Sequence, residues 1–171
     1  GLVGEVIGVI CDGTGYGTDG KLWGMEILSG GYASFRRHYH LAYTQMPGGE
    51  AAVRNPWRLA VGFLGHHFGS EGFMLAREVF PKRRKEIEFL RRQMETGLNC
   101  PDTSGCGRLF DAVSAILGLC EVATYEGQAA IELEACLDPN ADGAYPLDLR
   151  VADSGLILDH RALVAAAAKD A

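Results

Sequence analysis

The sequence predicts an α+β fold in which antiparallel strands come first and a helical region follows. Two apolar runs flank a glycine-rich stretch after Val6, which is typical of a β-hairpin. Apolar residues at helical spacing follow, and strand-like runs return before an alanine-rich C-terminal helix. No repeat or linker divides the 171 residues. We therefore expect one unit with three parts: a glycine-rich hairpin and third strand in 1–46, a helical region in 47–137, and a strand pair and terminal helix in 138–171.

The N-terminal part predicts three consecutive antiparallel strands. They cover 6–11, 23–28 and 32–43, and Asp12 is expected at the end of the first. In the third strand Phe35, Tyr39 and Tyr43 are expected on one face, with Arg36, His38 and His40 on the other. His38 and His40 would share a face and could both bind a metal, but no third ligand lies nearby, so a solvated face is the simpler interpretation.

The helical part predicts several amphipathic segments. A helix is expected from Pro56 to Leu64, with His66 and His67 at its end, followed by a connector over 69–81 that holds a short helix at 75–80. The basic segment 82–94 places Ile87, Leu90 and Met94 toward the core. The next helix, capped by Thr103 or Ser104, is expected to bury Leu109, Phe110, Val113, Ile116 and Leu117. Further elements are expected at 131–137, 147–151 and 156–158, with Asp159 capping the last helix.

Composition narrows the class of protein. The residues are 47% hydrophobic and 22% charged, as in soluble globular proteins, and a net charge of −6 disfavours general binding to nucleic acid. No apolar run approaches the roughly 20 residues of a membrane span, and no signal peptide opens the chain. Five cysteines without a C-x-x-C pair argue against a zinc knuckle and a disulfide framework, so we expect a cytoplasmic location. The chain begins at Gly1 rather than Met, and we expect it to be a piece of a longer protein.

The glycine-rich stretch is the main candidate site. Gly13, Gly15, Gly17 and Gly20 would let backbone N–H groups converge on a phosphate, and the Asp12 carboxylate could hold a cation beside it. A glycine-rich hairpin turn without a ligand explains the same pattern. The stretch fits neither the dinucleotide fingerprint nor the Walker loop.

Five sequence blocks in order resemble the carbamoyltransferase domain of the [NiFe]-hydrogenase maturation proteins, the HypF family. They are the hairpin 12–24 (DGTGYGTDGKLWG), 47–58 (PGGEAAVRNPWR), 99–104 (NCPDTS), 107–113 (GRLFDAV) and 125–130 (YEGQAA). Together they span residues 6 to about 137, which is most of the chain. The sequence departs from the family pattern at Met25, where a second glycine usually follows Gly24.

The resemblance implies part of an actin-like, sugar-kinase-like (ribonuclease-H-like) ATPase fold, related to the threonylcarbamoyl-tRNA transferases. It implies that Gly13, Thr14 and Gly15 contact the phosphate of an adenylate, and that Gly107 and Asp111 contact the ribose. Without the resemblance, Asp111 would be read as an acid on the helix surface. Asp12 would be a ligand of a divalent metal, zinc or iron, in the intact domain.

The implied reaction transfers a carbamoyl group from carbamoyl adenylate, made with ATP, to the C-terminal cysteine of a partner maturation protein. The product supplies the cyanide ligands of [NiFe]-hydrogenase. The family's other metal ligands are expected outside these residues, so we expect the chain alone to bind metal weakly and to be inactive. An O-carbamoyltransferase of small-molecule biosynthesis and a non-catalytic, partner-docking fragment remain alternatives. Exposed strand edges would favour a homodimer.

Overall fold

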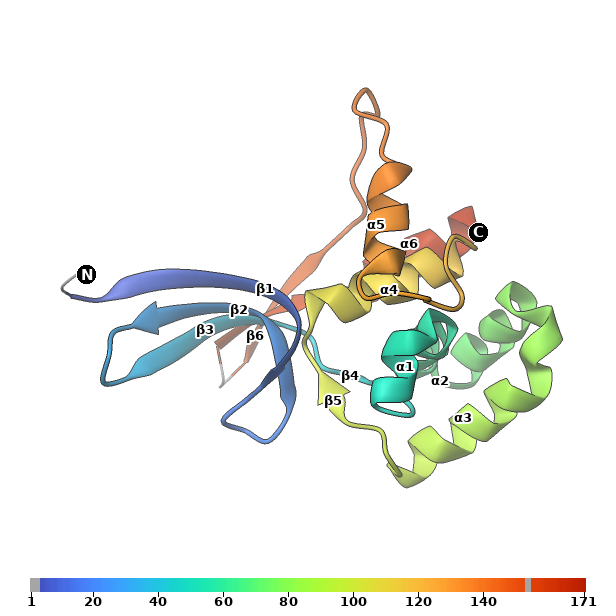
Figure 1. Ribbon diagram of the computed structural model, residues 1–171, viewed down its shortest axis with the longest axis horizontal. Coiled ribbons are helices and arrows are strands. Elements are labelled where there is room, and N and C mark those ends of the chain that lie inside the picture. Colours follow the sequence, from blue (N-terminus) through green and yellow to red (C-terminus); the bar gives the residue numbers. More distant parts are fainter. Residues whose placement is uncertain (1–3, 153–154) are drawn as a thin grey trace.

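The computed structural model describes residues 4–152 and 155–171 and combines one curled sheet with a group of helices (Figure 1). The strands are β1 (Val6–Tyr16), β2 (Leu22–Gly30), β3 (Phe35–Leu41), β4 (Thr44–Gln45), β5 (Asp102–Thr103), β6 (Asp148–Ala152) and β7 (Gly155–Asp159). The helices are α1 (Glu50–Arg54), α2 (Pro56–Val79), the 3₁₀ turn η1 (Pro81–Arg83), α3 (Arg84–Thr96), α4 (Cys106–Ile116), α5 (Gln128–Ala135) and α6 (Arg161–Asp170). No helix among the described residues is long and apolar enough to cross a bilayer.

The sheet has seven strands in the order β4-β5-β2-β3-β7-β6, and β1 pairs with β2 off this path. The first three strands are antiparallel, and so are β6 and β7, as the sequence predicts. β7 joins the sheet parallel to β3, which brings the C-terminal part beside the N-terminal part. The N-terminal half of β1 and the turn between β2 and β3 extend away from the helices (Figure 1), whereas the C-terminal half of β1 lies against α4.

The first strand is longer than the apolar run suggests. β1 continues through Asp12 to Tyr16, and its pairing with β2 shifts between Cys11 and Gly15. The turn comes later, where the Gly17 N–H donates to the Lys21 carbonyl at 2.8 Å. The expectation that Asp12 ends the strand is therefore wrong, because β2 supplies backbone partners beyond the glycines and leaves an irregular bulge there.

A second irregularity interrupts β3. Its pairing passes from Ile27 with Tyr39 to Leu28 with Arg37, so His38 is an extra residue. His38 Nε2 and Ser29 Oγ form a hydrogen bond of 2.8 Å. His40 is buried, with 2% of its surface exposed. The expected uninterrupted alternation, with a solvated face for both histidines, is wrong. The described residues contain no group of three His, Cys, Asp or Glu side chains arranged to hold a metal.

The second helix is also longer than expected. α2 runs through Gly65, His66 and His67, and its one non-helical residue is Gly69, with φ 56°. The ring of Phe73 occupies the space beside Gly65, so the absence of a side chain there serves packing between the two halves of α2. The predicted helix end at Leu64 is wrong, because the first half of α2 continues to the kink at Gly69. The predicted break at residue 69 coincides with this kink, but the residues after it are helical to Val79 rather than over 75–80 alone. His67 lies inside α2 and exchanges a hydrogen bond with His160 at 2.8 Å.

The core lies where α2, α3, α4 and α6 meet. Ile87, Leu90 and Met94 of α3 are buried, as their spacing predicts. α4 packs on α2 and also on β1, so nearly every position on it is buried. Phe110 is the exception at 46% exposure, which contradicts its expected place in the core. The polar residues Arg108 and Asp111 occupy buried positions of this helix instead.

One predicted cap is wrong, and another lies one residue before the helix boundary. The residue before α4 is Gly105, whose N–H donates to Thr103 Oγ1 at 3.0 Å, while Ser104 Oγ donates to Glu26 Oε1 at 2.6 Å. Neither side chain caps the helix. Before α6, Asp159 Oδ1 accepts the N–H of Arg161 at 2.9 Å, although His160 is the residue at the boundary. The Ser104 side chain bonds to the sheet instead of the helix, so no side chain caps the first turn of α4.

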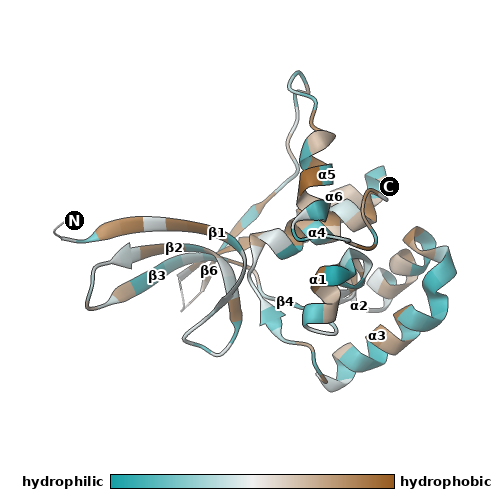
Figure 2. Ribbon diagram, viewed as in Figure 1, coloured by the Kyte–Doolittle hydropathy of each residue, from teal (hydrophilic) through white to brown (hydrophobic). Residues whose placement is uncertain are grey.

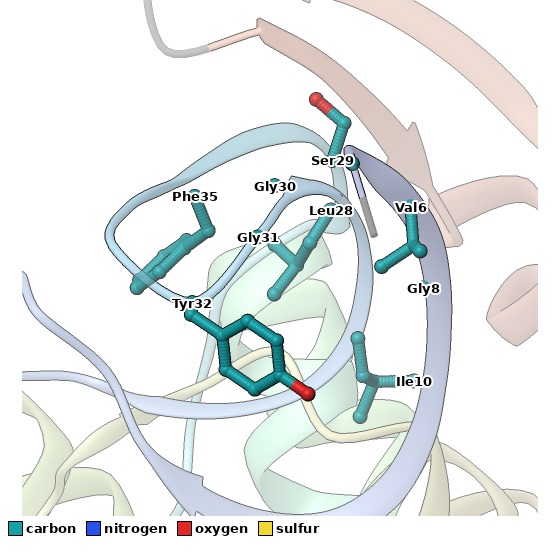
Figure 3. Close-up of a pocket in the computed structure, with 10 residues that line it drawn as sticks. Val6, Gly8, Ile10, Leu28, Ser29, Gly30, Gly31, Tyr32 and Phe35 are labelled. Carbon is teal, nitrogen blue, oxygen red and sulfur yellow. The ribbon is translucent and has the colours of Figure 1, made fainter. Parts of the chain in front are cut away.

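Both faces of β1 remain uncovered near its N-terminal end by the described residues. An apolar cleft of about 480 Å³ lies between β1 and the turn that joins β2 to β3, and side chains from both strands point toward it (Figure 3). Ile7 and Val9, on the other side of β1, are 77% and 64% exposed. The hydrophobic part of β1 is visible along the extended hairpin (Figure 2). Both faces of this strand are therefore apolar and open, which is consistent with the expected self-association without testing it.

Candidate functional site

The bulge of β1 and the first turn of α4 meet through glycines. A methyl group on Gly107 would lie 2.8 Å from the Cα of Gly13, and one on Gly105 would overlap the Gly13 carbonyl oxygen. A methyl group on Gly24 would lie 2.5 Å from the Asp12 carbonyl oxygen. Any side chain at these positions would push strand and helix apart, so the glycines permit the close approach. Two sequence blocks that are almost 100 residues apart thereby form one site.

A buried ion pair fixes the hairpin beside this helix. Arg37 Nη2 of β3 lies 2.8 Å from Glu26 Oε1 of β2, and the Ser104 hydroxyl donates to the same oxygen. The Arg37 guanidinium also stacks 3.9 Å above the ring of Trp23. The indole N–H of Trp23 donates to Asp19 Oδ1 at 2.8 Å, which closes the hairpin turn. These contacts hold β2, β3 and the start of α4 in one register.

Asp12 lies at the exposed edge of the bulge. Its Oδ1 accepts the N–H of Gly13 at 2.6 Å, so part of the carboxylate is used within its own turn. Thr14 is exposed, and Gly13 and Gly15 are half-buried. The bulge therefore presents backbone and one carboxylate to solvent, next to α4.

The most unusual charged groups lie on α4 itself. Asp111 is 4% exposed and Arg108 is 9% exposed, and Arg108 Nη2 lies 2.8 Å from Asp111 Oδ2. The distance is that of an ion pair, but neither Asp111 Oδ2 nor Arg108 Nε has a partner with hydrogen-bond geometry among the described residues. Burial raises the pKa of Asp111 to about 6, against the attraction of Arg108, which lowers it. The pair is therefore incompletely satisfied.

A cavity of about 490 Å³ opens beside this pair. Arg108 and Asp111 of α4 line it together with Glu50, Val53 and Arg54 of α1 and the segment 123–129 that leads into α5. The segment contains Tyr125, Gly127 and Gln128 of the fifth family block. Gln128 Oε1 accepts the N–H of Thr124 at 2.7 Å, which closes this wall of the cavity. Such a concave site with a few polar groups is the usual form of a small-molecule site.

The structure brings most of the predicted site residues together. Asp12 and Gly13 lie against Gly107, and Asp111 follows one turn later in the cavity wall. Gly107 faces Gly13 and is absent from the cavity lining, so its observed role is close packing. The reading of Asp111 as a surface acid is wrong, because the residue is buried. Sequence reasoning missed Arg108, although its i, i+3 spacing from Asp111 is a signal for a side-chain pair on one helix face.

Comparison with known proteins identifies the family. The family model described as the second subdomain of the carbamoyltransferase Kae1-like domain matches residues 8–171. A probable carbamoyltransferase HypF of Methanocaldococcus jannaschii is 40% identical over 123 residues, which are 72% of this chain and 16% of the relative. Carbamoyltransferase HypF of Synechocystis sp. is 34% identical over 179 residues, covering 95% of this chain and 23% of the relative. The chain thus spans less than a quarter of either relative.

Solved structures agree with the sequence relatives. A crystal structure of full-length HypF in a phosphate- and nucleotide-bound form superposes with a TM-score of 0.85 at 34% identity, over 98% of this chain and 22% of that one. HypF of T. kodakarensis gives a TM-score of 0.74 at 29% identity, over 96% of this chain and 22% of that one. These likenesses confirm the fold class that the sequence motifs indicate. The chain belongs to the HypF carbamoyltransferase family, where it corresponds to the second subdomain of the Kae1-like domain.

Proposed function

We propose that this chain supplies the ribose-binding and phosphate-binding surfaces of a carbamoyltransferase. The enzyme moves a carbamoyl group from carbamoyl adenylate to the C-terminal cysteine of a partner maturation protein, for the cyanide ligands of [NiFe]-hydrogenase. Family membership supports the carbamoyl transfer. The related full-length protein that was crystallised with phosphate and nucleotide supports the nucleotide.

The observation that carries the proposal is the Asp111 carboxylate. It is buried in a cavity wall, and its Oδ2 has the ion pair with Arg108 at 2.8 Å but no partner with hydrogen-bond geometry among the described residues. Leaving a buried charged acceptor unsatisfied costs about 1–3 kcal/mol or more, so the folded protein gains when a ligand donates to it. The two hydroxyls of a ribose are suitable donors for a carboxylate.

The phosphate would lie toward the β1 bulge. There Gly13, Thr14 and Gly15 offer backbone groups without large side chains, and Gly107 lets α4 approach them closely. The N-terminal end of α4 adds a favourable partial positive charge. Ribose on Asp111 and phosphate at the bulge would thus occupy neighbouring parts of the same surface.

A metal is only partly accounted for by this chain. Asp12 is the proposed ligand of a divalent ion, zinc or iron, but the described residues contain no group of three suitable side chains. One carboxylate does not make a stable site, so no step is assigned to a metal here. Residues 1–171 alone should bind metal weakly and transfer no carbamoyl group, and thiocarbamate formed by the isolated chain would contradict this.

The reaction depends more on how the protein positions the adenylate and the thiolate than on proton transfer by the protein. The thiolate of the partner cysteine attacks the carbamoyl carbon, a C–S bond forms, and the bond from that carbon to the phosphate oxygen breaks. AMP leaves with the electron pair, and the thiol proton passes to solvent as the thiolate forms. Because the mixed anhydride is already activated, holding ribose and phosphate in place brings the carbonyl to the thiolate.

The test is a calorimetric titration of AMP into a protein that contains this chain and has the full length of its HypF relatives. The titration is done without and with a divalent metal. Asp111→Asn should weaken AMP binding at least about 10-fold, because it removes charge-assisted hydrogen bonds. Asp12→Ala should weaken binding of the metal. Asp142→Asn in an exposed loop is the matched control and should change neither. Unchanged AMP affinity in Asp111→Asn would refute the ribose assignment.

Two other functions make different predictions. An O-carbamoyltransferase would consume a hydroxylated acceptor and leave a cysteine peptide unmodified. A partner-docking fragment would bind through α3, where a groove of about 460 Å³ is lined by Arg84, Lys85 and the 62% exposed Phe89. Reversal of Arg84 and Lys85 to Glu tests this surface, with Arg36→Glu as control, and unchanged partner affinity would exclude it. Arg83 is unsuitable for the test, because it pairs with Glu121 at 3.0 Å.

A further inference from the structure

Arg108 is a buried cation with more donors than the protein satisfies. Its guanidinium carries five N–H donors, and its side chain is 11% exposed. Its Nε has no hydrogen-bond partner among the described residues, and its acidic contact is Asp111, whose Oδ2 lies 2.8 Å from Nη2. A buried guanidinium with an unpartnered donor is costly and is retained where a ligand supplies a further acceptor.

The position of the guanidinium matches the gap between the two halves of the candidate site. Its Nη2 lies 2.8 Å from Asp111 Oδ2 and 3.1 Å from the place where a side chain would begin on Gly13. A larger residue in place of Gly13 would therefore press on the guanidinium. Arg108 also lines the cavity that contains Asp111. It lies between the carboxylate proposed for ribose and the bulge proposed for phosphate.

We propose that Arg108 binds the phosphate of the nucleotide directly, and that Asp111 orients its guanidinium while binding the ribose. This inference rests on the proposed nucleotide function and adds a residue that specifies a phosphorylated ligand. A planar guanidinium can donate two parallel hydrogen bonds to phosphate oxygens, which an ammonium group cannot do. The unpartnered Nε of Arg108 and the backbone groups of the β1 bulge would then share one ligand, the phosphate.

The alternative is that Arg108 only neutralises Asp111. The two roles separate when ligands with and without phosphate are compared. A phosphate-binding arginine contributes to AMP affinity and leaves adenosine affinity nearly unchanged. A residue that only shapes the cavity affects both ligands alike.

The experiment titrates adenosine and AMP into the protein at the full length of the family. Arg108→Gln should lower AMP affinity about 10- to 100-fold, as expected for charge-assisted hydrogen bonds, while adenosine affinity changes less than about 3-fold. Arg108→Lys should restore AMP affinity only in part, and it serves as the second variant if the glutamine variant does not fold. Arg91→Gln is the matched control, since Arg91 is exposed, pairs with Glu95 on α3 and does not line this cavity.

The outcomes distinguish this inference from the proposed function. If Arg108→Gln leaves the ratio of AMP affinity to adenosine affinity unchanged, Arg108 does not bind the phosphate. If Asp111→Asn still weakens adenosine in that case, the nucleotide site stands without it. If the wild-type protein binds neither adenosine nor AMP, the proposed function fails and this inference fails with it.

Discussion

Replacement of Asp111 by Asn should stabilise the chain while it removes nucleotide binding. Burial raises the pKa of this carboxyl from 3.8 to about 6, so the folded protein holds its proton more tightly than the unfolded chain does. Between those values the folded state binds more protons, and the free energy of unfolding therefore falls as the pH rises. At 1.36 kcal/mol per pKa unit, the ionised group costs about 3 kcal/mol above pH 6.

Asn resembles the protonated acid in shape and keeps an oxygen acceptor for Arg108. The attraction of Arg108 is already contained in this pKa, because it opposes the rise. Asp111→Asn should thus match the wild type near pH 4 and exceed it by up to about 3 kcal/mol at pH 8. Urea denaturation between pH 4 and 8 measures the difference. A variant less stable than wild type at pH 8, or a difference that does not change with pH, would show that the ionised carboxylate is not strained by burial.

Two further predictions concern the helices that position the site. His160→Ala should lower the free energy of unfolding by about 2–4 kcal/mol, because a fully buried ring is lost together with its contact to His67; urea denaturation at pH 7 measures this. Burial lowers the pKa of His160 to about 4 and that of His67 to about 3, so wild-type stability should fall as the pH drops from 6.5 toward 4, and the His160→Ala variant should show a shallower fall. Gly107→Ala should cost about 1–3 kcal/mol despite the better helix propensity of Ala, since its methyl group meets the β1 backbone. Thermal unfolding measures this loss of stability. Gly143→Ala, at a site with open space, is the control and should change the stability little.

Local sequence patterns predicted the elements that contact the core along one face only. The spacing of Ile87, Leu90 and Met94 is enough to place α3, since only one side of that helix meets the core. Helix α4 is different, because it is covered by α2 on one side and by β1 on another. Its polar residues are buried with its apolar ones, so a periodicity argument alone could not identify Asp111 or exclude Phe110.

The other errors arose at glycines, because a glycine can end an element but can also allow close packing inside one. Gly65 was read as a helix end, but it lies inside α2 where Phe73 needs the room. Gly13 and Gly15 were read as a turn, but they belong to a strand that continues because β2 supplies partners. In both cases a distant segment decides the conformation, and this segment is visible only in the folded chain. The family blocks contain residues that the fold brings together, because they record such contacts without explaining them.

The features that cost stability in this structure concentrate on one turn of α4. Gly107 weakens the start of the helix, and Arg108 and Asp111 bring charge into its buried part without complete hydrogen bonding. A helix that served only packing would place small or apolar residues at these positions. Because binding and stability should respond in opposite directions to the same change, Asp111→Asn separates the two explanations. A variant that gained stability and kept its affinity for AMP would assign the cavity to packing, whereas a gain in stability with loss of AMP binding would identify the strain as the requirement of a ligand site.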